Sequence, residues 1–223
     1  MLLQRETEEE IVGEFAALAA ASMRSEALDS LVQLNGQCLD LLADQALAQP
    51  AQGNLLLRQM GEIWRTLDAA ARRRAASCPY LLVDAGFSDP GRWRWLEGRH
   101  VNDGAPPATY GSFFTVPRAS AVARQVFLYA WHLAQSKHTA AQLLLGMPSY
   151  CSHVISACTL PQIHELAERY PEWMRPRWPN KVKVWREMLL AAASGEVVAL
   201  ENARMHGVQL LAGEVRAAAL RAR

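Results

Sequence analysis

Basic and aromatic side chains alternate in residues 169–187, and this pattern is the strongest candidate for binding chemistry in the chain. Lysine and arginine neutralise the phosphates of nucleic acids, and arginine also donates to the edge of guanine. We therefore predict that this segment faces DNA, with its interleaved tryptophans serving as core anchors. The side chains predicted to contact DNA are Arg175, Arg177, Lys181, Lys183 and Arg186.

Two other interpretations of these basic residues remain open. The same charges are typical of a solvated surface, and of a surface that faces another protein. A second and weaker basic patch, formed by Arg92, Arg94 and Arg99, alternates with tryptophans in residues 92–99. In the stronger segment the cations flank a turn and the start of a helix, where free N–H groups attract phosphate.

The sequence holds no recognisable catalytic pattern. Its six histidines are scattered, and neither a glycine-rich phosphate loop nor a nucleophile elbow is found. The cysteines form no C-x-x-C pair, although Cys151 and Cys158 with His153 and His164 make a conceivable N/S cluster. Small core hydrophobes in a reduced compartment are the favoured interpretation of these cysteines. We expect no enzyme, no metal and no cofactor.

Size and charge restrict the class of protein. The chain has 223 residues, of which 51% are apolar and 20% are charged, which is enough for one large domain or two small ones. A net charge of +1 excludes a strongly basic nucleic-acid binder but allows a local basic patch. The sequence has no apolar run long enough to span a membrane, and its acidic start is unlike a signal peptide. We expect a cytoplasmic protein.

Hydrophobic periodicity predicts an all-α fold in three parts. Residues 1–76 form an N-terminal helical bundle or dimerisation element, with helices at 6–22, 25–48 and 54–76. Residues 77–117 form an irregular, aromatic-rich connection, with a possible strand at 80–83. Residues 118–223 form a helical regulatory domain, in which a helix at 118–136 precedes a short-helix module. An Asn180-capped helix that ends near Gly195 and a last helix at about 196–220 complete this part.

The module at 138–169 reads as three short helices with marked ends. Gly146 suits the left-handed position after a helix, and Pro148 suits the first turn of the next one. Thr159 and Gln162 have the spacing of a capping box, so we expect Thr159 to cap a helix over 160–169. Short helices at sharp angles are how helix-turn-helix modules are built.

The same module resembles a known family. The order LLLG-M-x6-ISACTLPQIHELAE is similar to the D subunit of the bacterial flagellar master transcriptional activator (FlhD-type), where a Leu-Gly helix end is followed by Ala-x-Leu-Thr-Leu-Pro-Gln. The matching residues are Leu145-Gly146, 155–157 and 159–162. The likeness extends more faintly over about residues 121–213, whereas residues 1 to about 118 have no counterpart in that family.

This resemblance implies a transcriptional regulator subunit. It would act as a homo-oligomer with a companion FlhC-like subunit, which in the family supplies a zinc site and much of the DNA contact. Its targets would be flagellar or mobile-element genes, and DNA would be bound weakly or only in the complex. The alternative is a helical protein-interaction adaptor or anti-activator that does not bind DNA.

Overall fold

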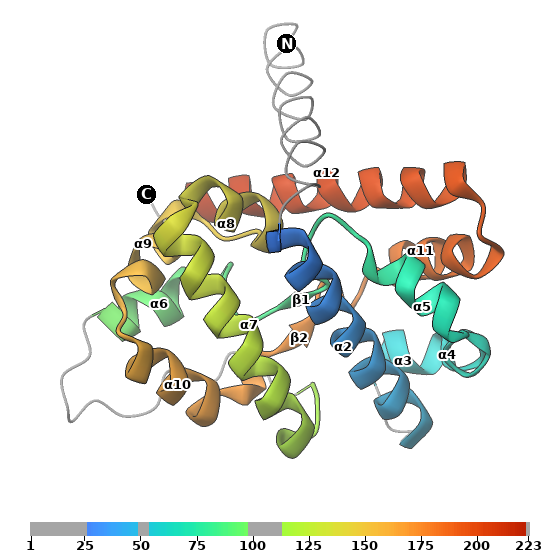
Figure 1. Cartoon of the computed structure of the whole chain (residues 1–223), viewed down its shortest axis with the longest axis horizontal. Helices are drawn as coiled ribbons and strands as arrows, with labels where there is room; N and C mark the ends of the chain where they lie inside the picture. The colour runs from blue at the N-terminus through green and yellow to red at the C-terminus, as the bar shows by residue number, and fades with distance from the viewer. Residues whose placement is uncertain (1–25, 49–53, 98–112, 222–223) are drawn as a thin grey trace, which may run out of the picture.

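Helices make up most of the chain, as Figure 1 shows. The computed structural model describes residues 26–48, 54–97 and 113–221. The predicted all-α class is confirmed, since the strands in these ranges form only a two-stranded sheet. The predicted helix at 6–22 and the basic residue Arg99 lie outside the described residues.

One side of the molecule combines helices from the first third of the chain with one from its last third (Figure 1). α5 packs against both α2 and α11, and α3 also contacts α11. The helices of this side are α2 (Glu26–Ala48), α3 (Leu55–Gln59), α4 (Gly61–Thr66), α5 (Ala69–Ala76) and α11 (Val182–Ser194).

The single helix predicted over 54–76 is wrong, because α3, α4 and α5 occupy that range and a capping side chain starts α5 inside it. The Asn54 side chain accepts a hydrogen bond from the backbone N–H of Leu56, at 3.0 Å, and so caps α3. The Asp68 side chain accepts from the N–H of Ala71, at 2.6 Å, and so caps α5. A capping residue has non-helical backbone angles, so a continuous helix cannot pass through Asp68.

The other side of the molecule is built around the long helix α7 (Val116–Ser136). This helix contacts three short helices in succession, and α9 in turn contacts α6 (Pro90–Glu97). The three short helices are α8 (His138–Leu145), α9 (Ser149–Ala157) and α10 (Leu160–Arg169). A 3₁₀ turn, η1 (Pro171–Trp173), follows α10 and also packs on α7.

The prediction of an irregular connection over 77–117 is wrong for α6. Its start has a recognisable cause, because the Asp89 side chain accepts a hydrogen bond from the Gly91 N–H at 3.0 Å. Pro90 then occupies the first helical position, where its fixed φ angle suits a helix and its missing N–H costs nothing. The strand in this region, β1 (Val83–Asp84), overlaps the predicted strand at one residue.

The helix ends in the module at 138–169 were predicted well. Gly146 is left-handed at φ 60°, and a Cβ there would lie 2.3 Å from Leu211 Cδ1. Thr159 and Gln162 form the predicted capping box, in which the Gln162 side chain accepts from the Thr159 N–H at 2.7 Å. Pro148 lies one residue earlier than predicted, at the N-cap of α9 rather than in its first turn.

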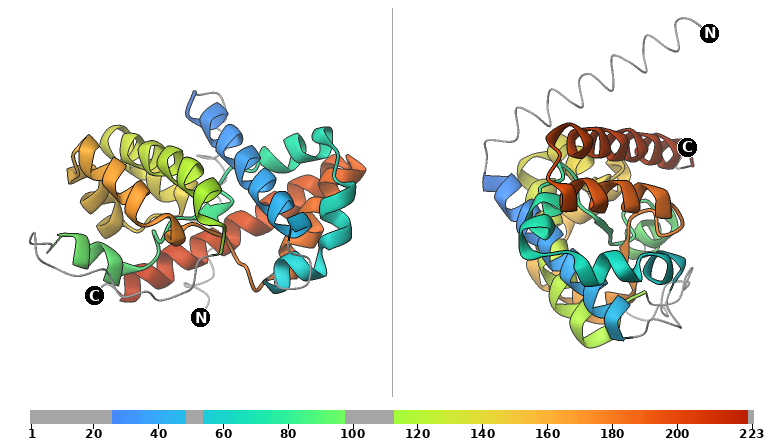
Figure 2. Two further views of the ribbon diagram at one scale, coloured as in Figure 1. Left: turned by 90° about the horizontal axis from the view of Figure 1, so that it is seen from below. Right: turned by 90° about the vertical axis from the view of Figure 1, so that its right-hand side faces the viewer.

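The C-terminal helix α12 (Val197–Arg221) joins the two sides. Figures 1 and 2 show it running along both of them, and it contacts α11 on one side and α8 on the other. One hydrophobic core connects residues from Leu28 to Leu211. The predicted units 1–76 and 118–223 therefore share a core, because α11 packs among the N-terminal helices.

The chain buries most of its tryptophans without a partner. Covering these large apolar side chains therefore needs no second copy of the chain. The buried tryptophans are Trp64, Trp93, Trp173, Trp178 and Trp185. In the described ranges, no helix is both long enough and apolar enough to cross a membrane.

Candidate functional site

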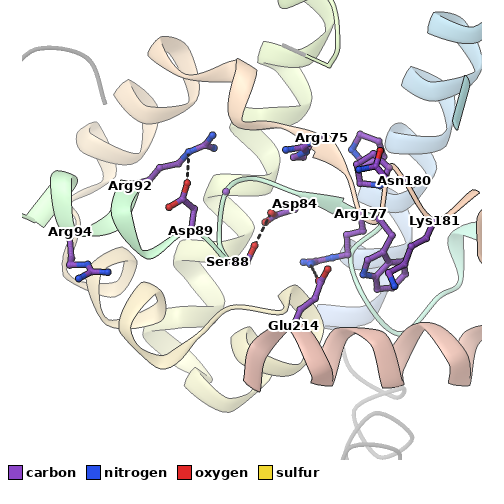
Figure 3. Close-up of a pocket in the computed structure, with 14 residues that line it drawn as sticks. Asp84, Ser88, Asp89, Arg92, Arg94, Arg175, Arg177, Asn180, Lys181 and Glu214 are labelled. Atoms are coloured by element: carbon purple, nitrogen blue, oxygen red, sulfur yellow. Dashed lines mark hydrogen bonds and ion pairs between the residues drawn. The ribbon is translucent and has the colours of Figure 1, made fainter. Parts of the chain in front are cut away.

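A hollow of about 890 Å³ brings together the two basic segments that the sequence singled out. The two-stranded sheet positions them, because β1 pairs antiparallel with β2 (Arg175–Pro176), with Asp84 opposite Arg175. Figure 3 shows the charged side chains that surround the hollow. Its cations are Arg92, Arg94, Arg175, Arg177 and Lys181, and its carboxylates are Asp84, Asp89 and Glu214.

Arg92 forms one wall of the hollow and is only 5% exposed. Its guanidinium lies over the Trp173 ring, 5.0 Å from the centroid, which is a cation–π arrangement. The Arg92 Nε atom lies 3.3 Å from Asp89 Oδ2, an ion pair in which Nε makes no hydrogen bond of ordinary geometry. Gly86 leaves room for this side chain, because a Cβ there would lie 2.7 Å from Arg92 Nη1.

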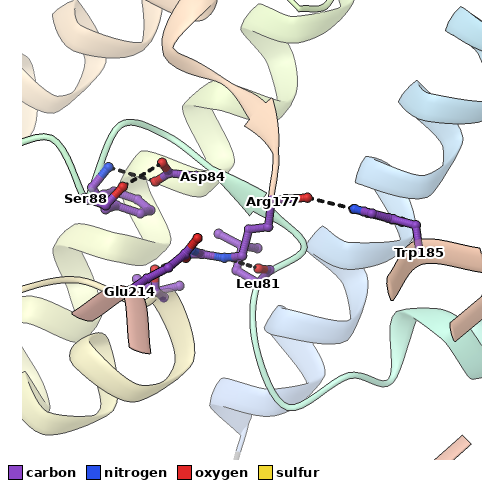
Figure 4. A network of polar contacts seen from close by, with 8 residues as sticks. Leu81, Asp84, Ser88, Arg177, Trp185 and Glu214 are labelled. Carbon is purple, nitrogen blue, oxygen red and sulfur yellow. Dashed lines mark hydrogen bonds and ion pairs between the residues drawn. The ribbon is translucent and has the colours of Figure 1, made fainter. Parts of the chain in front are cut away.

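Arg177 forms the floor of the hollow and is 2% exposed. As Figure 4 shows, it connects parts of the chain that are distant in sequence. Its Nε donates to the Leu81 carbonyl at 2.6 Å, and Nη2 donates to the carbonyl of Leu145, the last residue of α8. Its Nη1 lies 3.4 Å from Glu214 on α12, so one guanidinium joins the β1 segment, α8 and α12.

The prediction that Arg177 contacts DNA phosphates is therefore wrong. A side chain that is 2% exposed cannot reach a duplex, and its donors already have acceptors inside the protein. A guanidinium at the end of α8 also satisfies a C-terminal carbonyl and opposes the negative end of the helix dipole. Its role in the structure is to hold the β1 segment, α8 and α12 together.

Burial raises the pKa of the Glu214 carboxyl, and the nearby Arg177 guanidinium lowers it by a smaller amount. Glu214 also faces the hollow, so it influences the charge there. Asp84 is held in place differently, since it accepts from the Phe87 N–H at 2.9 Å and from the Ser88 hydroxyl at 3.2 Å. The hollow thus has fixed carboxylates as well as fixed cations.

The remaining predicted DNA contacts lie at the start of α11. Lys181 is the N-cap residue, and Lys183 and Arg186 follow in the first turns; all three side chains are exposed. Lys183 Nζ lies 3.8 Å from Glu187, four residues later, an exposed pair of the kind that contributes little to stability. Arg175 differs from these three, because it is half-buried in β2 and lines the hollow.

The exposed side of α10, by contrast, is not basic. Glu165 pairs with Arg169 at 3.2 Å, and Glu168 pairs with Arg124 of α7 at 3.2 Å. A helix that reads the major groove usually presents donors to bases and cations to the flanking phosphates. The third helix of the module therefore lacks the charge expected of a recognition helix.

The thiols are placed for packing rather than for reaction. Cys38, Cys78 and Cys151 are buried, and Cys158 is half-buried. Burial raises the pKa of the Cys78 thiol to about 11, so it stays protonated and weakly nucleophilic at neutral pH. Among the described residues, no three His, Cys, Asp or Glu side chains come together as metal ligands.

Sequence reasoning missed the carboxylates of the hollow. Asp84, Asp89 and Glu214 stand in three separate segments, and nothing in their spacing brings them near the cations. The Asp89-Pro90 pair was the one local signal, because it marks a helix start beside Arg92.

The chain matches no family model, no curated protein and no solved structure.

Proposed function

We propose that this protein is a subunit of a transcription-regulating complex that contacts DNA through the exposed start of α11. The observation that carries the proposal is that Lys181, Lys183 and Arg186 are exposed within the first turns of one helix. Contacts of this kind bind phosphates and set the position of a protein on the duplex, but they carry no sequence information.

Base recognition is assigned to a companion subunit of the FlhC-like kind. The acidic pairs on α10 support this division, because they disfavour insertion of that helix into a groove. The net charge of +1 also favours weak binding by the isolated chain. The resemblance of the module at 138–169 to the FlhD-type subunit supports the same arrangement, with a homo-oligomer as the acting species and flagellar or mobile-element genes as targets.

The proposal is tested by DNA binding with and without the companion subunit. We expect the double variant Lys181→Ala/Lys183→Ala to weaken binding of the complex to every duplex sequence while its thermal stability stays unchanged. Arg118→Ala is the matched control, because it removes an exposed cation from α7. A DNA-contacting role is contradicted if no DNA binding is seen either with or without the companion subunit. It is also contradicted if the double variant binds DNA as strongly as the wild type.

A protein-interaction adaptor is the second candidate, and one observation favours it. Three apolar side chains are strongly exposed where α11 turns into α12: Leu190 at 50%, Val197 at 72% and Val198 at 69%. Exposed apolar patches mark protein contacts more often than nucleic-acid contacts. If Val198→Asp abolishes association with the companion and the α11 lysine variants leave DNA binding unchanged, the adaptor function replaces the first proposal.

A further inference from the structure

We infer that two exposed arginines at the junction of α3 and α4, Arg58 and Arg65, contact the phosphate backbone of duplex DNA together with the start of α11. The inference rests on the proposed function and deepens it, because it extends the DNA-contacting surface from one helix to three. The sequence patterns assigned no binding role to residues 54–66, in which both arginines stand.

The first observation is that α3 and α4 lie beside the start of α11 (Figure 1). Arg186 Nη2 lies 3.5 Å from the carbonyl oxygen of Gln59, the last residue of α3. The rings of Trp64 on α4 and Trp185 on α11 pack with their centroids 6.3 Å apart. Because Arg186 belongs to the proposed DNA-contacting surface, the junction of α3 and α4 adjoins that surface.

The positions of the two arginines are the second observation. Arg58 stands just before Gln59 in the last turn of α3, Arg65 stands in the last turn of α4, and both are exposed. The Arg65 side chain reaches back along α4, because a Cβ on Gly61 would lie 3.7 Å from its Nη2 atom. Gly61 is two residues from the Gln59 carbonyl that Arg186 meets, so Arg65 is turned toward the same junction.

The charges of Arg58 and Arg65 are not neutralised within the part of the chain that the structure describes, where neither forms an ion pair. The helix that packs against α3 and α4 is α2, and its nearby carboxylates are engaged elsewhere. Asp40 pairs with an arginine of α5 at 3.2 Å, and Asp44 pairs with an arginine of α7. Both guanidinium groups are therefore available to an anionic partner.

Positive charge is concentrated in this part of the molecule. Residues 54–66 and 180–187 together hold five cations and two carboxylates, whereas the whole chain has a net charge of only +1. The cations come from α3, α4 and the start of α11, so they are spread over a surface rather than gathered around one point. Such a surface suits a partner with many regularly spaced negative charges, which is what the backbone of duplex DNA presents.

A purely structural role is the competing explanation for these arginines, because a cation in the last turn of a helix opposes the negative end of the helix dipole. Arg73 separates the two explanations. It is also exposed in the last turn of a short helix, α5. It stands beside the end of α11 rather than its start, since the neighbouring Arg74 donates from Nε to the Ala192 carbonyl at 2.6 Å. Arg73→Ala is therefore the matched control.

The test is the salt dependence of binding to a duplex of mixed sequence. It is measured for the full chain at low salt, where phosphate contacts are strongest, and again for the complex with the companion subunit. Arg58→Ala/Arg65→Ala is expected to flatten the slope of log K against log salt by about 1.8, because each phosphate contact contributes about 0.9. Arg73→Ala is expected to leave the slope unchanged. Arg58→Lys/Arg65→Lys keeps both charges and is expected to keep the wild-type slope.

The outcomes separate this inference from the proposed function. An unchanged slope in Arg58→Ala/Arg65→Ala, with a flattened slope in Lys181→Ala/Lys183→Ala, overturns the inference and leaves the proposed function standing. Absence of DNA binding by the wild type in both settings overturns the two together. Equal flattening in Arg73→Ala overturns the inference, because any exposed cation would then have the same effect. Loss of association between the arginine variant and the companion in the absence of DNA overturns it as well, because the surface would then face a protein.

Discussion

Replacing Arg177 with alanine is expected to destabilise the protein far more than removing any exposed cation of the same segment. The substitution leaves the carbonyls of Leu81 and Leu145 without their buried donor. Leaving a buried hydrogen-bonding group without a partner costs about 1–3 kcal/mol, so the two carbonyls together cost about 2–6 kcal/mol. The partly exposed Glu214 contributes less to this loss, because solvent replaces its partner. The two carbonyls therefore account for most of the cost.

Thermal unfolding followed by circular dichroism measures this loss. In a chain of this size 1 kcal/mol shifts the melting temperature by about 2–4 °C, so Arg177→Ala is expected to melt about 4–24 °C lower. Lys183→Ala is the control, since its side chain is 86% exposed and its loss costs within about 0.5 kcal/mol. Equal melting temperatures for the two variants would refute the assignment of Arg177 to the interior.

Three further predictions follow from other parts of the structure. Gly207→Ala is expected to lower the free energy of unfolding, because the new Cβ would lie 1.8 Å from the Tyr80 hydroxyl oxygen. Gly213→Ala is the comparison in the same helix, because its Cβ has no other atom within 4 Å, and it should raise the free energy of urea unfolding by up to about 1 kcal/mol. Thr159→Ala removes part of the α10 capping box and is expected to lower the free energy of urea unfolding by about 1 kcal/mol. An unchanged urea midpoint counts against the cap. Burial raises the pKa of the Glu214 carboxyl above its ordinary value of 4.5 in the folded protein. The contribution of this carboxyl to stability is therefore complete below pH 4.5 and is lost as the pH rises through the raised pKa. The melting temperature of Glu214→Gln should therefore rise relative to wild type across that window, and a constant difference would exclude the linkage.

Local signals in the sequence predicted the helix ends well. Gly146 and the pair Thr159–Gln162 act within a few residues, because a left-handed turn or a capping box depends only on its neighbours. The same kind of local signal stands at Asp68 and at Asp89-Pro90, where a side chain accepts from the backbone of the first helical turn. These caps mark the start of α5 within the helix predicted over 54–76 and the start of α6.

Long-range packing could not be predicted in this way. Arg177 donates to a carbonyl that is 96 residues away, and nothing in its own segment distinguishes it from Lys181 or Lys183. The association of α11 with α3 and α5 likewise depends on apolar surfaces from opposite ends of the chain. Charge and spacing thus found the right segment, but only the fold separated the internal arginine from the exposed lysines.

The salt dependence of DNA binding tests the central claim most directly. The logarithm of the binding constant is measured against the logarithm of salt concentration for the complex of this protein with its companion. Each phosphate contact contributes about 0.9 to the slope, so Lys181→Ala/Lys183→Ala is expected to flatten it by about 1.8. A slope that is identical in wild type and in the double variant would contradict a phosphate-contacting role for the start of α11.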